Sequence, residues 1–316
     1  MVFDILLFVL GLALLYFGAD WLIRGAASLA LRFGIRPLIV GLTVVALGTS
    51  MPEFIVNFFA AVAGEDGLAL GNVIGSNIAN IALILGVSAL VFPMNVSKRM
   101  LFREYPILVA IMFGFYYLAS DGMITKSDGI MLVLALVVFL IYIVLDSRKT
   151  NKASVDTESV ASEALLPTWK KVLFLVGGIA LLSGGARLMV LSAIDIAEFL
   201  GVSSAIVGLT VVAIGTSLPE LAASVMCAMR EEVDLSFGNV LGSNILNVLF
   251  VIGLIALIRP LQVDTESIEI HMPIMLAFTV ALLPIARTQY QITRVEGGLL
   301  VAGFIGYLYY LILPHV

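Results

Sequence analysis

The sequence GLTVVALGTSMPE at residues 41–53 returns almost unchanged as GLTVVAIGTSLPE at residues 208–220. The two copies agree at 11 of 13 positions. A second pair, GNVIGSNIANI at 71–81 and GNVLGSNILNV at 238–248, agrees at 8 of 11 positions. Both pairs are separated by the same 167 residues. One constant offset across two motifs indicates that the chain contains an internal duplication.

The composition around these motifs is that of a membrane protein. Hydrophobic residues fill 61% of the 316 positions and charged residues 12%, with a mean hydropathy of +1.13. Soluble domains carry roughly 25% charged residues, and a membrane span needs roughly 20 apolar residues. We therefore expect an all-α integral membrane protein with ten transmembrane helices, which lie near residues 4–23, 37–62, 69–92, 103–120, 128–145, 170–190, 204–229, 236–258, 270–286 and 296–313.

The duplication and the span count together predict a topology. We expect a first repeat at 1–145, a linker at 146–169 and a second repeat at 170–316. Each repeat contains five expected spans, an odd number, so the second repeat would enter the membrane from the opposite side. Inverted repeats of this kind are typical of secondary transporters, whose site lies at the midplane where helices are broken.

The basic residues predict the orientation in the membrane. If the N-terminus is outside, 14 of the 17 Lys and Arg residues fall in inner loops and 3 in outer loops. Positive residues accumulate in cytoplasmic loops. We therefore expect a multi-pass protein of the cell membrane with both termini outside and residues 146–169 in the cytoplasm as a flexible tether. The small net charge of −5 gives no indication of a nucleic-acid partner, and no obligatory protein partner is evident.

Two acidic residues, Glu53 and Glu220, end the first motif in the middle of apolar spans. An acidic side chain at that depth costs about 2.5–3.5 kcal/mol on insertion scales. The sequence offers no cationic residue at the same depth to form a salt bridge. A bound cation or a proton is the more plausible compensation.

The neighbouring residues provide oxygen atoms that suit a hard cation. On a helix, the hydroxyls three and four residues before each glutamate share its face: Thr49, Ser50, Thr216 and Ser217. Pro52 and Pro219 lack an N–H, which predicts unpaired carbonyls over residues 46–48 and 213–215. Carboxylate, hydroxyl and carbonyl oxygens together suit Ca²⁺ or Na⁺.

The second motif adds hydroxyls and amides. Ser76 and Asn80 form an i, i+4 pair, as do Ser243 and Asn247. Four further asparagines are expected to hold bent backbone: Asn72, Asn77, Asn239 and Asn244. Four glycines form small-xxx-small pairs that let helices approach closely: Gly71, Gly75, Gly238 and Gly242.

The paired GTS-x-PE and GN-x-x-GSN-x-x-N motifs resemble the α-repeats of the sodium/calcium exchanger family, within the cation/calcium antiporter superfamily. The resemblance covers both halves and is strongest to short prokaryotic members. It implies a secondary active antiporter rather than an enzyme, with Ca²⁺ and Na⁺ as substrates, the lipid bilayer as surroundings and no cofactor.

The resemblance also implies four cation sites around Glu53 and Glu220. The remaining ligands would be Thr49, Ser50, Thr216, Ser217, Asn80, Asn247, Ser76, Ser243, Ala46 and Ala213. Some relatives carry Asp where this chain has Asn247. The site here would thus contain two carboxylates rather than three, which argues against K⁺ coupling. The first span of each half is the expected moving part, with hinges at Gly-rich turns near Gly18 and Gly25 and near Gly184 and Gly185.

Three other functions remain open from the residues alone. An H⁺/Ca²⁺ antiporter would use the same fold with protons as the competing ligand. A cation channel would conduct without a counter-ion. A membrane-embedded hydrolase would need a nucleophile–base pair or a metal triad, and the sequence offers no suitable His, Cys or Asp cluster.

Overall fold

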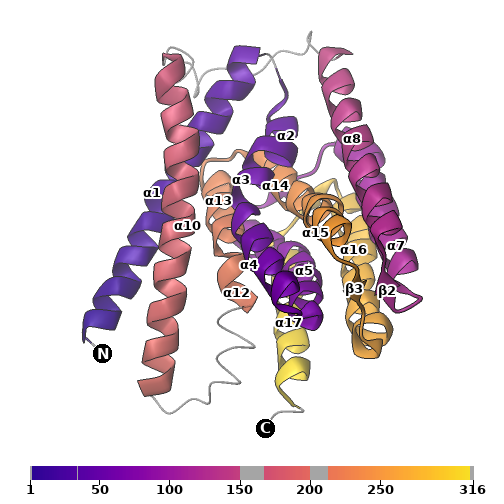
Figure 1. Cartoon of the computed structure of the whole chain (residues 1–316). Helices are drawn as coiled ribbons and strands as arrows, with labels where there is room; N and C mark the ends of the chain where they lie inside the picture. Colours follow the sequence, from indigo (N-terminus) through magenta and orange to yellow (C-terminus); the bar gives the residue numbers. More distant parts are fainter. Residues whose placement is uncertain (1, 34, 150–166, 200–212, 314–316) are drawn as a thin grey trace.

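The computed structural model describes residues 2–33, 35–149, 167–199 and 213–313 (Figure 1). Within these ranges, seven helices are long and apolar enough to cross a membrane, and a bent pair of helices makes an eighth candidate. The strands in the described ranges are four, of two residues each. The protein is therefore an all-α multi-pass membrane protein, as the composition predicts.

Two long helices form the centre of the molecule, and each contains one copy of the second motif. The first, Asp66–Val91, is built from α5 (Asp66–Ala79), η2 (Asn80–Ile84) and α6 (Leu85–Val91). The second, Val233–Ile258, is built from α14 (Val233–Leu246), η5 (Asn247–Ile252) and α15 (Gly253–Ile258). The apolar window of each is 78% buried inside the protein, against 22–33% for the other five candidates. These two helices are the core around which the others pack.

The first motif lies on a broken helix in both copies. In the first half, α2 (Pro37–Val40), η1 (Gly41–Val45) and α3 (Ala46–Thr49) lead to Ser50, where the chain bends by 46° into α4 (Met51–Ala63). Ser50 has φ −82° and ψ 2°, outside the helical region. Because Pro52 has no N–H, it cannot complete the hydrogen-bond ladder at this point.

The second copy breaks at the equivalent residue. Helix α12 (Ala213–Thr216) ends at Ser217, which has φ −89° and ψ 4°, and α13 (Leu218–Met229) follows. Residues 208–212 of this motif and the start of the expected span 204–229 lie outside the described residues. Both copies thus present a half helix that begins just before its glutamate.

Short π-helical segments begin at equivalent positions of the two central helices. Segment η2 begins at Asn80 and η5 begins at Asn247. A π turn adds a residue to the helical repeat and changes which side chains share a face, and such turns are frequent at functional sites. The sequence pattern did not predict these segments.

The remaining helices pack outside the core, and two small sheets join the halves. Segment η3 (Met100–Glu104) continues into α7 (Tyr105–Ala119), followed by α8 (Lys126–Lys149). Segment η6 (Ser267–His271) continues into α16 (Met272–Arg287), followed by α17 (Arg294–Ile312). The antiparallel strand pairs, β1 with β4 and β2 with β3, each take one strand from either half: Met94–Asn95 with Gln291–Ile292, and Met123–Ile124 with Leu261–Gln262.

The two longest helices, α1 (Val2–Phe33) and α10 (Thr168–Phe199), lie side by side at one edge of the molecule (Figure 1). A Cβ added at Gly18 would lie 2.7 Å from the backbone nitrogen of Leu182, and one added at Gly178 would lie 2.6 Å from that of Leu22. Glycine therefore allows the two backbones to touch.

The expectation of hinges at Gly-rich turns in these helices is wrong. Gly18 and Gly25 lie inside the continuous α1, and Gly184 and Gly185 lie inside α10. A Cβ added at Gly18, Gly25 or Gly185 would lie 2.9 Å or less from atoms of the opposite helix. Their role in the structure is close packing.

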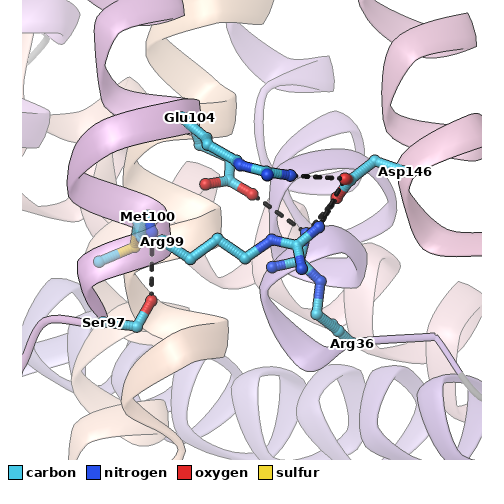
Figure 2. A network of polar contacts seen from close by, with 7 residues as sticks. Arg36, Ser97, Arg99, Met100, Glu104 and Asp146 are labelled. Carbon is cyan, nitrogen blue, oxygen red and sulfur yellow. Dashed lines mark hydrogen bonds and ion pairs between the residues drawn. The ribbon is translucent and has the colours of Figure 1, made fainter. Parts of the chain in front are cut away.

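An ionic cluster around two buried carboxylates joins three segments at the end of the molecule where α8 ends and α10 begins (Figures 1 and 2). Arg36 Nη2 lies 3.0 Å from Glu104 Oε1 and 2.7 Å from Asp146 Oδ2. Arg99 Nη2 lies 2.5 Å from Asp146 Oδ1, and Arg103 Nη1 lies 3.4 Å from the same atom. Buried charges are tolerated when they are paired in this way. The cluster ties the residue before α2 to η3 and to the end of α8.

The close contact between α1 and α10 predicts different effects for alanine substitution at two glycines of α10. We expect Gly178→Ala to lower the free energy of unfolding by about 1–3 kcal/mol, because the new methyl would press on backbone that cannot yield. Gly184→Ala, on the same helix, meets no described atom within 4 Å and should be neutral or slightly stabilising. Thermal unfolding of both variants in detergent measures the difference. Equal melting temperatures would show that α1 and α10 do not pack as described.

Candidate cation site

The two glutamates of the first motif lie together in the protein interior. Glu53 is in the first turn of α4, Glu220 is in the first turn of α13, and each is 1% exposed. Ser50, three residues before Glu53, contacts Glu220 and so brings the two glutamates near one another across the halves. Each glutamate sits at the N-terminal end of a half helix, where unpaired N–H groups and the helix dipole favour negative charge.

The serine at each break contacts the other half of the molecule. Ser50 Oγ donates a hydrogen bond to Glu220 Oε1 at 3.0 Å. Ser217 Oγ lies 3.3 Å from Ser76 Oγ, to which it donates. Both hydroxyls therefore have partners in the opposite half, which the spacing before each glutamate did not predict.

The threonines before the breaks also reach across the halves, and they do so symmetrically. Thr49 Oγ1 donates to Asn239 Oδ1 at 3.2 Å, and Thr216 Oγ1 donates to Asn72 Oδ1 at 3.2 Å. Thr49 Oγ1 also lies 3.2 Å from the carbonyl of Val45. Each copy of the first motif is thus held by the second motif of the other copy.

Two polar residues that the sequence reasoning missed complete these contacts. Asn72 Nδ2 donates to Asn57 Oδ1 at 2.9 Å, and Asn239 Nδ2 donates to Ser224 Oγ at 2.9 Å. Asn57 and Ser224 are fully buried and lie 167 residues apart, four residues after each glutamate. The sequence contains one signal that could have identified them: a polar residue at the same repeat position in two apolar helices. They fix Asn72 and Asn239, which are therefore structural residues.

Five buried oxygens of the expected ligand set accept no hydrogen bond from the described residues. They belong to both carboxylates, two amides and one hydroxyl: Glu53 Oε2, Glu220 Oε2, Asn80 Oδ1, Asn247 Oδ1 and Ser243 Oγ. A buried oxygen without a partner costs about 1–3 kcal/mol. Five of them from the same two motifs form a set of hard ligands that suits a cation such as Ca²⁺ or Na⁺.

The carbonyl of Ala46 is more occupied than the motif suggested. It accepts the N–H of Ser50 at 2.9 Å, and the Thr49 hydroxyl oxygen lies 3.3 Å from it. Its counterpart Ala213 is the first residue of α12. The carbonyl that loses its helical donor is that of Gly48, because Pro52 has no N–H to donate to it.

The glycines of the second motif differ between the halves. A Cβ on Gly238 would lie 2.9 Å from Gly41 Cα, and one on Gly242 would lie 2.6 Å from the Leu42 carbonyl oxygen. Close helix approach is therefore present at these two positions. Gly71 and Gly75 meet no atom within 4 Å among the described residues, and the equivalent stretch 208–212 lies outside them.

The site does not have the composition of a transition-metal centre. Among the residues that the structure describes, no group of three or more His, Cys, Asp or Glu residues could hold a metal ion. Cys227 is a buried thiol, and His271 lies beside Glu266 and Tyr307, on the outer helices. His315 lies outside the described residues. The chemistry available at the core is therefore that of neutral oxygens around two carboxylates.

Comparison with known proteins places this arrangement among cation exchangers. The family described as sodium/calcium exchanger protein matches residues 3–145 and again residues 170–313. The chain is 39% identical to inner membrane protein YrbG of Escherichia coli, over 96% of this chain and 94% of that protein. It is 33% identical to the sodium/calcium exchanger MaX1 of Methanosarcina acetivorans, over 96% and 97%. The solved structure of the sodium-calcium exchanger NCX_Mj superposes with a TM-score of 0.84 at 30% identity, covering 98% of this chain and 99% of that one.

The contact between Thr49 and Asn239 can be tested through stability. We expect Thr49→Val to lower the free energy of unfolding by about 1–3 kcal/mol, because the buried Asn239 oxygen loses its donor. Thr49→Ser keeps the hydroxyl and should retain most of the stability. Thermal unfolding in detergent compares the three proteins. A valine variant as stable as the serine variant would mean that the contact does not hold the halves together.

Proposed function

This chain belongs to the sodium/calcium exchanger protein family, and from that premise we propose that it exchanges Ca²⁺ for Na⁺ across the membrane as a secondary active antiporter. The protein is a transporter and not an enzyme. One observation carries the proposal. Five unpaired buried oxygens from both halves, including one of each glutamate, lie in the two duplicated motifs.

We propose that the chain forms ten transmembrane helices in two inverted repeats, at 1–145 and 170–316. The seven long helices and the bent pair would be eight of the ten. Helix α13 with the residues before it, and α17, would be the other two. The separate family matches to each half support this division. So does the recurrence of the break, the π segment and the small strand at 167-residue intervals, as in Ser50 and Ser217, Asn80 and Asn247, and Met94 and Leu261.

We propose that both termini face outside and that the linker at 146–169 is cytoplasmic. The N-terminal end of α1 and the C-terminal end of α17 lie at the same end of the molecule, opposite the ends of α8 and α10 that flank the linker (Figure 1). The basic cluster of Arg36, Arg99 and Arg103 lies at the linker end. An excess of Lys and Arg favours the cytoplasmic side.

The proposed mechanism is electrostatic competition at a shared site. Without ions the site would bury about two negative charges, and moving them across the barrier would be very costly. One Ca²⁺ neutralises the site, and so do several Na⁺ ions, so only loaded forms alternate between the two sides. Both ions would use Glu53 and Glu220, and binding of one would weaken binding of the other. This competition couples the two gradients.

The other proposed ligands supply neutral oxygens around the two carboxylates. They are Thr49, Ser50, Thr216, Ser217, Asn80, Asn247, Ser76, Ser243, Ala46 and Ala213.

We propose that α1 and α10 form the part that moves relative to this site. Their glycine contacts support movement as a pair rather than hinging within either helix.

A proton is the second candidate for the coupling ion. The burial of Glu53 and Glu220 in the same part of the interior favours it, because neighbouring buried carboxyl groups can share a proton. Proteoliposomes that contain the purified protein separate the candidates. Ca²⁺ uptake driven by a pH gradient without Na⁺ would identify H⁺ as the coupling ion. Conduction of Ca²⁺ without any counter-ion would instead indicate a channel.

We expect Glu53→Gln and Glu220→Gln each to abolish Na⁺-dependent ⁴⁵Ca²⁺ flux in proteoliposomes while the protein stays folded. The amide keeps the shape of the side chain and removes the charge that two ions would compete for. Glu65→Gln, an exposed position in the connection between α4 and α5, is the matched control and should transport normally. Wild-type flux in either site variant would overturn the assignment of the site.

We expect Asn247→Asp to change the ion or pH dependence of transport, because it adds a third carboxylate to the set. An aspartate also cannot donate the hydrogen bond that Asn247 Nδ2 makes to Asn77 Oδ1 at 3.2 Å. Flux measured against Na⁺, K⁺ and pH separately reports the change. If neither the ion selectivity nor the pH response moves, Asn247 does not contact the transported ion.

A further inference from the structure

Four buried asparagines form two crossed pairs where the central helices meet. Asn80 Nδ2 donates to Asn244 Oδ1 at 2.9 Å, and Asn247 Nδ2 donates to Asn77 Oδ1 at 3.2 Å. All four are 1% exposed or less. We propose that Asn77 and Asn244 are positioning residues, which orient Asn247 and Asn80 so that their side-chain oxygens face the transported ion. This inference rests on the proposed function.

The orientation of Asn80 follows from a backbone carbonyl. Asn244 Nδ2 donates to the backbone oxygen of Asn77 at 3.4 Å. A carbonyl oxygen can only accept, so the amide nitrogen of Asn244 must face it and the amide oxygen must face away, toward Asn80. Asn80 must then donate its own N–H to that oxygen. Its Oδ1, on the other side of the planar amide, is left as one of the unpaired oxygens.

The orientation of Asn247 follows from two sulfur atoms. Asn77 Nδ2 lies 3.8 Å from the sulfur of Met112 and 3.7 Å from that of Met275. Thioether sulfurs accept weakly and cannot donate, so they favour the nitrogen of Asn77 on their side and its oxygen toward Asn247. Asn247 then donates, and its Oδ1 is also left unpaired. Sulfur holds an amide less firmly than a carbonyl does, so Asn247 is the more easily turned of the two.

Loss of a positioning partner would let an amide turn a hydrogen-bond donor, instead of its oxygen, toward the ion. Without its acceptor, the amide of Asn80 or Asn247 can rotate and present N–H groups, which carry partial positive charge, where it had presented oxygen. Both residues begin a π segment, so the backbone already places them at a fixed point of the helix. The remaining freedom is the rotation of the amide, which the crossed pairs control.

The test uses leucine substitutions, which remove the amide and keep the branching of the side chain and its number of heavy atoms. We expect Asn77→Leu and Asn244→Leu to raise the half-saturating Ca²⁺ concentration for uptake into proteoliposomes on the order of tenfold, the cost of one lost polar contact of about 1.4 kcal/mol. The maximal rate should change less. Stabilisation of the purified protein by Ca²⁺, measured for each variant as the shift in melting temperature that Ca²⁺ causes, should fall. The melting temperature without ions should also be lower than that of the wild type, because a buried amide N–H loses its acceptor.

A double-mutant cycle separates positioning from a general structural role. If Asn77 acts through Asn247, then Asn77→Leu should have no further effect on Ca²⁺ affinity in a protein that already carries Asn247→Ala. It should retain its full effect in the Asn80→Ala background. Asn244→Leu should show the reverse pattern. Asn95→Leu removes an exposed asparagine outside the duplicated motifs, whose Oδ1 accepts a hydrogen bond from Gln291 Nε2 at 3.0 Å. It is the matched control and should leave Ca²⁺ affinity unchanged.

The outcomes distinguish this inference from the proposed function. If the wild-type protein shows neither Ca²⁺ uptake nor stabilisation by Ca²⁺, the proposed function is wrong. If the wild type shows both and the leucine variants match its Ca²⁺ affinity, the positioning role is wrong. Effects that persist undiminished in both alanine backgrounds would also overturn it. Should a leucine variant not fold, Asn77→Ala and Asn244→Ala remove the same groups and enter the same cycle.

Discussion

The fold is built around the cost of placing two carboxylates inside an apolar protein. Glu53 and Glu220 are almost fully buried, so the loss of water around each carboxylate opposes its charge. The helix breaks at Ser50 and Ser217 lower this cost, because each glutamate comes to lie in the first turn of a new helix. The unpaired N–H groups of that turn favour a negative charge. The proline therefore causes each break, and the helix N-terminus that results stabilises the charge of the glutamate.

The contacts around the glutamates explain why one motif cannot form the site alone. Ser50 donates to the glutamate of the other half, and each threonine before a break binds an asparagine of the other half. The polar groups of one copy are therefore satisfied only when the second copy is in place. The two central helices, which are the most buried of the long helices described, bring the copies together. The same contacts between the halves therefore hold the core together and assemble the site.

Much of this arrangement is predictable from the sequence, for identifiable reasons. Composition predicts the helices, the constant offset predicts equivalent positions, and the prolines two residues after Ser50 and Ser217 predict the breaks. The partners of the hydroxyls are not predictable, because they depend on the direction of the chain after a bend of 46°. The π segments and the roles of Asn57 and Ser224 also depend on packing between residues far apart in sequence. For the glycines of α1, the sequence alone does not distinguish a flexible hinge from a site of close contact with another helix.

The crossed contacts have a consequence for the origin of the chain. Counted within a repeat, position 80 of one half binds position 77 of the other, and the reverse pair is also present. Position 49 binds position 72 in the same reciprocal manner. Reciprocal pairs of this kind define an interface between identical subunits related by a two-fold axis. An ancestor of half the present length could thus have formed the same core as a homodimer. Because both copies now lie in one chain, equivalent positions can differ between the halves, as Asn57 and Ser224 do.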